Sequence, residues 1–205
     1  MHKLLLAAVL AVLTTASLSP ASAADRSNRW EGLRLNASWI NPGASAKYEV
    51  DTSPVTAGKM TGSLVGVGVG YDFQFGRFVV GFDANFYGGI IEAQENLRFI
   101  SVKGLALGTA SLGYAISDKL LVRAGGGPAF ALAHVGKMDT GLRYDTLSGV
   151  HAVVGVEYAL TRHTAVGFRA HRLRLADSSY STPAGIEGVN FKDSWMGELS
   201  LSYRF

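Results

Sequence analysis

Histidine, serine and carboxylate side chains are the residues of this chain that could carry out hydrolysis. After the first 23 residues, the histidines of the chain are His134, His151, His163 and His171. A histidine that activates a serine can cleave an acyl bond, and such a triad is defined by geometry and not by chain order. None of these four histidines is followed two residues later by a serine. His151 and His171 with Glu157 are a combination that folding could still assemble, but the sequence assigns no catalytic residue.

Metal and cofactor sites find no support in the spacing of these residues. Metal binding by His151 and His171 would need a third ligand and an open coordination position. The chain has no cysteine, which leaves neither a disulfide framework nor a thiolate metal site. The glycine run from Gly66 to Gly70 lies within a predicted strand, whereas a dinucleotide-binding fingerprint opens a helix. We expect these glycines to make room for strand curvature and for neighbouring side chains, and we predict no metal and no cofactor.

Charged residues recur on the polar face of alternating segments, which is where the inside of a barrel would lie. An eight-stranded barrel has an interior just wide enough for side chains, so long charged groups should meet across it. We therefore predict a polar, largely plugged lumen without a wide pore, in which Glu198 lies near Arg34 or Arg169. The predicted inward charges are five cations and four anions: Arg34, Lys103, Arg123, Arg169 and Arg204 with Asp72, Asp83, Glu157 and Glu198.

Eight segments position these residues, because each alternates apolar and polar residues at the period of a strand. The pattern is weaker in one segment, where Leu105 and Leu107 fall on the polar face. Pro128 lies inside another segment, and since proline donates no ladder hydrogen bond, we expect a bulge there. The predicted strands cover residues 32–40, 61–75, 78–87, 99–116, 120–132, 150–160, 164–173 and 194–205.

A repeated signature sets the order of these strands. A tyrosine followed at the second position by an apolar residue recurs at Tyr71, Tyr114, Tyr158 and Tyr203, at intervals of 43, 44 and 45 residues. Each unit holds two strands joined by one long loop, so four units predict eight strands. Short turns at 76–77, 117–119 and 161–163 alternate with long connections at 41–60, 88–96, 134–147 and 174–192.

Two further features of this arrangement indicate a membrane barrel. Short turns at one end and long loops at the other are typical of outer-membrane barrels, whose turns are periplasmic and whose loops are extracellular. Rings at the turn end would form an aromatic girdle, because such rings favour the interface between membrane and water. The predicted girdle consists of Tyr71, Phe73, Phe75, Phe78, Tyr114, Tyr158, Tyr203 and Phe205.

The start of the chain has the layout of a secretory signal peptide. Lys3 precedes an apolar run from Leu4 to Leu13, and the small-residue site Ala21-Ser22-Ala23 follows. We expect a signal peptide over residues 1–23 and one barrel domain over 24–205. No later apolar stretch is long enough for a transmembrane helix, yet 48% of the residues are hydrophobic, so only a closed barrel could cross a membrane. The net charge of +3 gives no reason to expect nucleic acid as a partner.

Several of these segments together resemble a known family, the porin-like outer-membrane β-barrel domain of alphaproteobacterial surface antigens, related to the OmpA-type barrel. The residues that carry the likeness are 68–86, 111–114, 155–160 and 201–205. The resemblance implies an all-β, eight-stranded antiparallel up-and-down transmembrane barrel in the outer membrane of a Gram-negative cell. It also implies that the strand ending in Phe205 is read by the barrel-assembly machinery, and it supplies no catalytic motif.

The expected function is therefore that of an integral outer-membrane surface or structural protein, at most a narrow porin, and not an enzyme. Outer-membrane lipid and lipopolysaccharide are the expected surroundings, and the long loops are available for haemin or host contact. There are two alternatives. One is a barrel enzyme that modifies lipid A as an acyl hydrolase, and the other is a soluble lipocalin-like carrier. A carrier would need an apolar lumen and a polar exterior. The predicted aromatic girdle and the charged residues on the opposite face of the strands indicate instead an apolar exterior and a polar lumen.

Overall fold

Period-two alternation produces strands in this chain because one face of each segment is apolar and the other polar or small. The computed structural model describes residues 29–43, 48–50, 61–95, 98–137, 141–176, 178–182, 185–191 and 194–205. The predicted signal peptide, residues 1–23, lies outside these described residues. Among the residues that the structure describes, no helix is long and apolar enough to cross a membrane.

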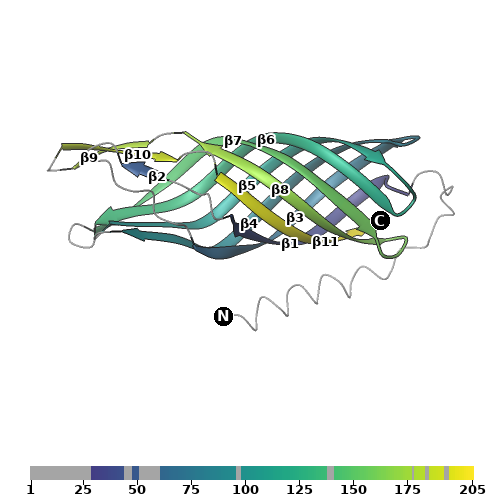
Figure 1. The fold of residues 1–205 in the computed structure, drawn as a ribbon, viewed down its shortest axis with the longest axis horizontal. Helices are drawn as coiled ribbons and strands as arrows, with labels where there is room; N and C mark the ends of the chain where they lie inside the picture. Colours follow the sequence, from purple (N-terminus) through teal and green to yellow (C-terminus); the bar gives the residue numbers. More distant parts are fainter. Residues whose placement is uncertain are drawn as a thin grey trace.

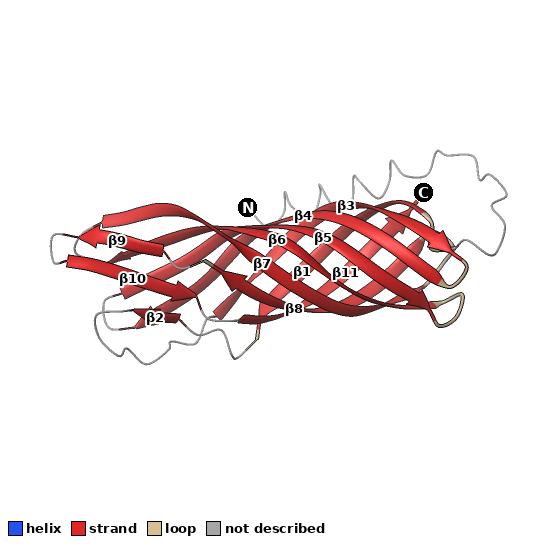
Figure 2. Ribbon diagram, turned by 90° about the horizontal axis from the view of Figure 1, so that it is seen from above, coloured by secondary structure: helices blue, strands red, loops and turns tan. Residues whose placement is uncertain are grey.

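Eight antiparallel strands close into a barrel, as predicted (Figure 1). β11 pairs with β1 on one side and with β8 on the other, and β1 also pairs with β3, so the first and last strands close the sheet. Figure 2 shows the barrel from a second side, with the strands tilted against its long axis. The barrel strands are β1 (Gly32–Pro42), β3 (Thr61–Phe75), β4 (Phe78–Glu95), β5 (Arg98–Ala115), β6 (Leu120–Lys137), β7 (Gly141–Ala159), β8 (Thr164–Leu175) and β11 (Ser194–Arg204).

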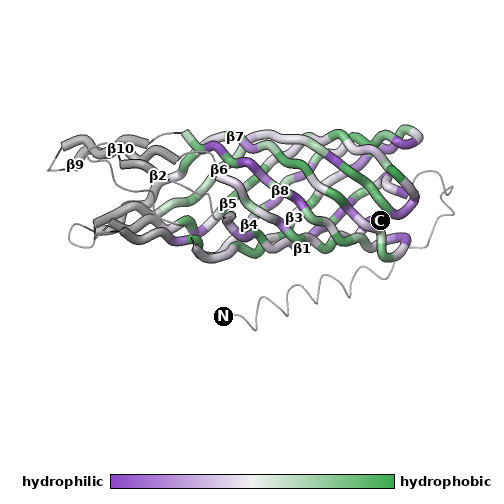
Figure 3. Tube along the Cα trace, viewed as in Figure 1, coloured by the Kyte–Doolittle hydropathy of each residue, from purple (hydrophilic) through white to green (hydrophobic). Residues whose placement is uncertain are grey.

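The two faces of the barrel separate by chemistry, as the alternation predicts. Along β11 the residues at even numbers from Met196 to Arg204 are buried, while the exposed or partly exposed residues lie between them. Large apolar side chains cover the outside, and Figure 3 shows apolar and polar residues alternating along the barrel strands. Of the predicted aromatic girdle, all rings but that of Tyr203 are exposed: Tyr71, Phe73, Phe75, Phe78, Tyr114, Tyr158 and Phe205. Tyr203 is partly exposed and stacks against His163 in the last turn.

The turn end of the barrel is built from tight connections. Gly76 has a φ of +62°, in the left-handed region that hairpin turns require and that glycine adopts readily. The turn between β5 and β6 is held by Ser117, whose hydroxyl accepts from the N–H groups of Lys119 and Leu120. In the turn between β7 and β8, the hydroxyl of Thr161 accepts from the N–H groups of His163 and Thr164 in the same way.

The long connections contain more strand than predicted. The segment 134–147 was expected to be a loop, but β6 and β7 stay paired there up to Lys137 and Gly141. The segment 88–96 likewise belongs mainly to β4, which continues to Glu95 opposite Arg98 of β5. The prediction failed because ladder hydrogen bonds depend on the backbone alone, so a hairpin can continue through residues that show no apolar alternation.

The first and fourth connections also form strands, which pair with each other beyond the loop end of the barrel. β2 (Tyr48–Val50), β10 (Gly185–Phe191) and β9 (Ser178–Thr182) make a small antiparallel sheet in the order β2-β10-β9 (Figure 1). β10 pairs with β2 from the connection that follows β1. The two connections are therefore joined by backbone pairing, although Val50 and its partner Val189 lie 139 positions apart in the sequence.

Two local predictions were wrong in the barrel strands β5 and β6. Leu107 pairs with Ala129 and Ala110 with Gly126, in one unchanged register, so this described stretch has no bulge at Pro128. The register of β5 against β6 shifts instead between Val102 and Gly104. At that shift Val102 is buried and Lys103 is exposed, the reverse of the predicted orientation, because a register irregularity exchanges the two faces of a strand.

Candidate functional site

The middle of the lumen holds a buried network of four arginines and four carboxylates. Arg34, on β1, is fully buried at its centre. Its Nη1 lies 3.0 Å from Oε1 of Glu157, its Nε lies 3.3 Å from Oδ2 of Asp72, and its Nη2 contacts Asp83. One guanidinium thus joins carboxylates from three strands, β3, β4 and β7. This supports the predicted pairing of charges across the lumen.

Three further arginines complete the network from other strands. Arg123 lies 3.1 Å from Asp72 and 3.2 Å from Glu157. Arg169 lies 2.8 Å from Glu157, and its Nη1 lies 3.8 Å from Glu198. Arg204 donates to Asp72 over 2.7 Å. Because Lys103 points outward, the described network contains four cations and four anions in place of the predicted five and four.

Small residues on the inner face leave the space that these long side chains occupy. A Cβ at Gly81 would collide with the carboxylate of Asp72 and would lie 2.8 Å from Nη1 of Arg123. A Cβ at Gly68 would collide with the side-chain oxygens of Asn36 and Asn85. These contacts match the prediction that the strand glycines serve neighbouring lumen side chains. A larger residue at either position would displace an inward polar group.

The histidines do not form the combination that the sequence left open. His171 lies with Nε2 2.6 Å from Oε2 of Glu198, and the hydroxyl of Ser38 donates to the other oxygen of that carboxylate over 2.8 Å. Glu157 is engaged by arginines instead. The serine and the histidine thus both hold the carboxylate, whereas hydrolysis needs a serine that contacts the histidine. This arrangement fixes Glu198 in place and activates no nucleophile.

Of the other histidines, His134 lies in β6 opposite Tyr144 of β7, and His151 and His163 have structural contacts. His151 lies with Nε2 3.1 Å from the hydroxyl of Thr109, and its ring centroid lies 5.7 Å from that of His171. His163 is exposed in the turn after β7, and its Nδ1 lies 3.0 Å from the backbone oxygen of Arg204. Within the described parts of the chain, no group of three or more histidine, aspartate or glutamate side chains could hold a metal ion.

A tryptophan that the sequence analysis did not single out lies buried at the turn end of the lumen. Trp30 precedes β1 and is 1% exposed, and it packs in one cluster with residues of β4 to β8, namely Val79, Ala115, Leu121, Ala159 and Ala165. The guanidinium carbon of Arg204 lies 5.1 Å from the centre of its ring, a cation–π contact. Its backbone N–H donates to Oε1 of Gln74, and Arg29 donates to the carbonyl of Thr161.

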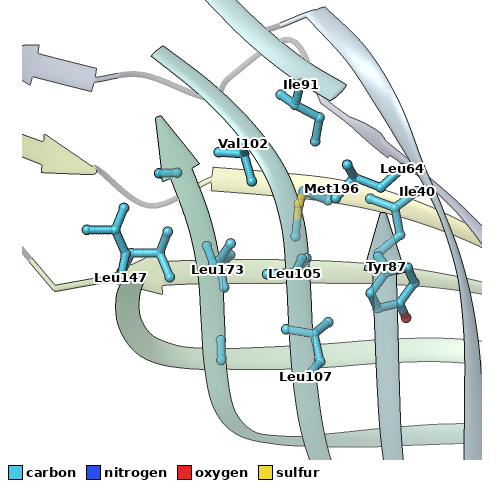
Figure 4. Close-up of a cluster of buried hydrophobic side chains, with 14 residues drawn as sticks. Ile40, Leu64, Tyr87, Ile91, Val102, Leu105, Leu107, Leu147, Leu173 and Met196 are labelled. Carbon is cyan, nitrogen blue, oxygen red and sulfur yellow. The ribbon is translucent and has the colours of Figure 1, made fainter. Parts of the chain in front are cut away.

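The loop end of the lumen is apolar, whereas the sequence predicted a polar lumen. Leu105 and Leu107, whose place on the polar face weakened the predicted pattern, belong to a buried cluster there (Figure 4). The cluster also contains Ile40, Leu64, Tyr87, Ile91, Val102, Ala129, Ala131, Ala133, Leu147, Leu173, Leu175 and Met196. Inside a barrel, side chains shielded from water pack well when they are apolar.

These features define a class of protein: a closed barrel with an apolar outer surface, an aromatic girdle at one end and an occupied interior. The model of the outer membrane protein beta-barrel domain matches residues 8–205. The chain belongs to this family, and it is an outer-membrane protein with an eight-stranded barrel.

Solved structures agree with this fold. The attachment invasion locus protein Ail of Yersinia pestis is 12% identical, with a TM-score of 0.54 over 85% of this chain and 99% of that chain. The Neisserial surface protein A is 14% identical, with a TM-score of 0.54 over 85% of this chain and 97% of that chain. No curated protein sequence matches the chain. At these identities the similarity concerns the fold alone.

Proposed function

We propose that the protein is a surface and structural barrel of the outer membrane whose lumen is closed to all but very small solutes. The observation that supports this proposal is that three successive layers of buried side chains lie inside the barrel. Trp30 and its neighbours fill the turn end, the paired arginines and carboxylates fill the middle, and the apolar cluster fills the loop end. An eight-stranded barrel has room for side chains and little else, which supports a closed interior.

We also propose that the barrel is not an enzyme. Ser38 and His171 both engage Glu198, so neither side chain of this group is arranged as an activated nucleophile. Glu198 and Ser38 are also buried among other lumen side chains, away from the lipid that an acyl hydrolase would have to reach. The lipid A-modifying enzyme therefore lacks a supporting observation among the described residues.

Contacts with other molecules belong to the two ends of the barrel in this proposal. At the loop end, the sheet of β2, β9 and β10 extends from the barrel and supplies a surface for haemin or host contact. At the turn end, the half-exposed ring of Phe205 ends the closing strand and is presented to the barrel-assembly machinery. Outer-membrane lipid and lipopolysaccharide surround the apolar band between them. No nucleic acid partner is proposed.

Planar-bilayer recordings test the closed lumen. The refolded wild-type protein should give no large, steady single-channel current, because paired charges and packed side chains fill the path. Glu198→Ala should raise the conductance slightly, since it removes the group that Ser38, His171 and Arg169 hold. Large, steady currents from the wild type would contradict the proposal.

Mass spectra of lipid A from cells with and without the protein test the enzyme alternative, and we expect identical acylation.

A further inference from the structure

Two arginines lie on the lipid-facing side of β8, close to its loop end. Along β8 the residues at odd numbers are buried, and those at even numbers face outward. Arg172 and Arg174 are both exposed, two residues apart and therefore on the same outer face. Figure 1 shows β8 beside β11, and Trp195 of β11 is paired directly with Arg172. Trp195 is 47% exposed, so an indole and two guanidiniums share one outer patch.

The position of the patch along β8 places it at the edge of the membrane. A strand that rises about 3.3 Å per residue and tilts by about 40° climbs roughly 2.5 Å per residue along the membrane normal. The apolar band of such barrels is about 25 Å tall, so a strand crosses it in about ten residues. Counted from Thr164 at the turn end, Phe168 falls within the band, and Arg172 and Arg174 fall at its extracellular edge.

The chemistry of this patch fits a phosphate at the membrane surface. Charged side chains on the lipid face are costly at the middle of the bilayer and tolerated only near the headgroups. A guanidinium binds phosphate through two parallel hydrogen bonds, and tryptophan favours the interface. On the turn side of the arginines, Phe168 and Leu199 are cross-strand partners with exposed side chains. They form an apolar surface against which acyl chains can pack.

We propose that Arg172, Arg174 and Trp195 form a docking site for a phosphorylated glycolipid of the outer leaflet, of the lipid A type. The arginines bind the phosphate, the indole lies against the sugar headgroup, and acyl chains run along Phe168 and Leu199. This inference rests on the proposed contact with lipopolysaccharide, and it assigns that contact to one side of the barrel.

Titration of the refolded protein in uncharged detergent with defined lipids tests the site. The probes are diphosphorylated lipid A, monophosphorylated lipid A and phosphatidylglycerol, and the readout is tryptophan emission with native mass spectrometry as a second measurement. The wild type should bind diphosphorylated lipid A with saturation and bind the other two lipids more weakly. The double variant R172Q/R174Q should bind it roughly tenfold or more weakly, because charge-assisted hydrogen bonds are lost.

Two matched variants separate the site from general surface charge. Lys103→Gln neutralises an exposed cation at the same end on β5, and Arg162→Gln neutralises an exposed arginine in a turn at the other end. Both should bind diphosphorylated lipid A within about twofold of the wild type, since neither contributes to the patch. An equal loss in all variants, or an unchanged affinity of R172Q/R174Q, would overturn the site.

Wild-type protein that does not discriminate between the three lipids would also overturn the site, without any variant. The heat-dependent mobility of the barrel on a gel shows in each sample whether the protein is folded. A folded wild type that carries no large current but binds no lipid A would refute this inference alone. The proposed closed surface barrel would then still stand.

Discussion

Glu198 shows how much of the lumen depends on single side chains. Its two oxygens accept from Ser38 and contact His171, and Arg169 lies beside it, while the whole side chain is buried. A buried charge is tolerated when oppositely charged partners and hydrogen bonds offset its loss of hydration. The carboxylate, on β11, therefore organises three residues from two other strands, β1 and β8.

Replacing Glu198 with alanine should destabilise the barrel strongly. The change leaves the guanidinium of Arg169 with one carboxylate fewer and removes the partner of His171. Breaking a buried pair costs about 3 to 5 kcal/mol, and water in the lumen would lower this cost. Thermal unfolding in detergent measures the effect. Asp118→Ala, at an exposed turn carboxylate, is the control and should change stability by less than about 0.5 kcal/mol. Equal unfolding temperatures for the two variants would contradict the network.

At the scale of elements, β11 closes the barrel and carries the terminal aromatic residue. The backbone N–H of Phe205 donates to the carbonyl of Leu33 over 3.0 Å, and its ring packs against Tyr203 with 5.1 Å between centroids. The ring is nevertheless 46% exposed. Phe205 thus contributes one ladder hydrogen bond and one edge contact, which is a small share of the pairing between β1 and β11.

Deletion of Phe205 should therefore impair assembly in cells more than stability. In vitro refolding into detergent should stay nearly normal, because the rest of the ladder from Arg34 opposite Arg204 remains. Insertion in cells, measured by outer-membrane fractionation, should fall sharply if the terminal ring is read by the assembly machinery. Phe75→Ala is a useful comparison, since it removes an exposed girdle ring on β3 and leaves the last strand intact. Equal losses in both settings would show that Phe205 acts through packing.

At the scale of the whole molecule, the barrel and the sheet beyond its loop end are separable. β2, β9 and β10 pair among themselves, and the strands of the barrel form their own closed ladder. The hairpin of β6 and β7 around residues 134–147 is different, because its ladder is continuous with the barrel. Ligand contact through the loops should therefore depend first on the connections that carry the small sheet.

Exchanging residues 44–60 and 177–193 together for short turns should leave the barrel folded and abolish haemin or host-cell binding, if the protein has either. Both exchanges are needed because β10 pairs with β2 across the two connections. The heat-dependent gel shift reports on folding, and haemin absorbance titration or adhesion to cells reports on binding. The single exchange of 44–60 is the control and removes β2 alone. Binding that survives the double exchange would refute the assignment to this sheet.

The sequence alone determined, away from the register shift in β5, which residues face the lumen and which face the lipid. Strand alternation is a local property, so the inward positions of Arg34, Asp72 and Glu157 follow from counting by two. The same reasoning predicted eight strands, an aromatic girdle, and short turns at one end of the barrel with long connections at the other. Local turn chemistry sufficed for the tight connections, because the Gly76 turn and its neighbours are short and polar.

Only the tertiary structure decided how these residues meet. Glu198 could have approached Arg34 or Arg169, and the closure of β11 against β8 places it beside Arg169 with His171 and Ser38. Lys103 turned outward because a register shift, which depends on the neighbouring strand, exchanged the faces of β5. Strand length beyond the membrane and the burial of Trp30 under Arg204 likewise depend on partners far away in the chain. Alternation fixes a side chain's direction, whereas its partner is set by how the closed sheet is tilted and staggered.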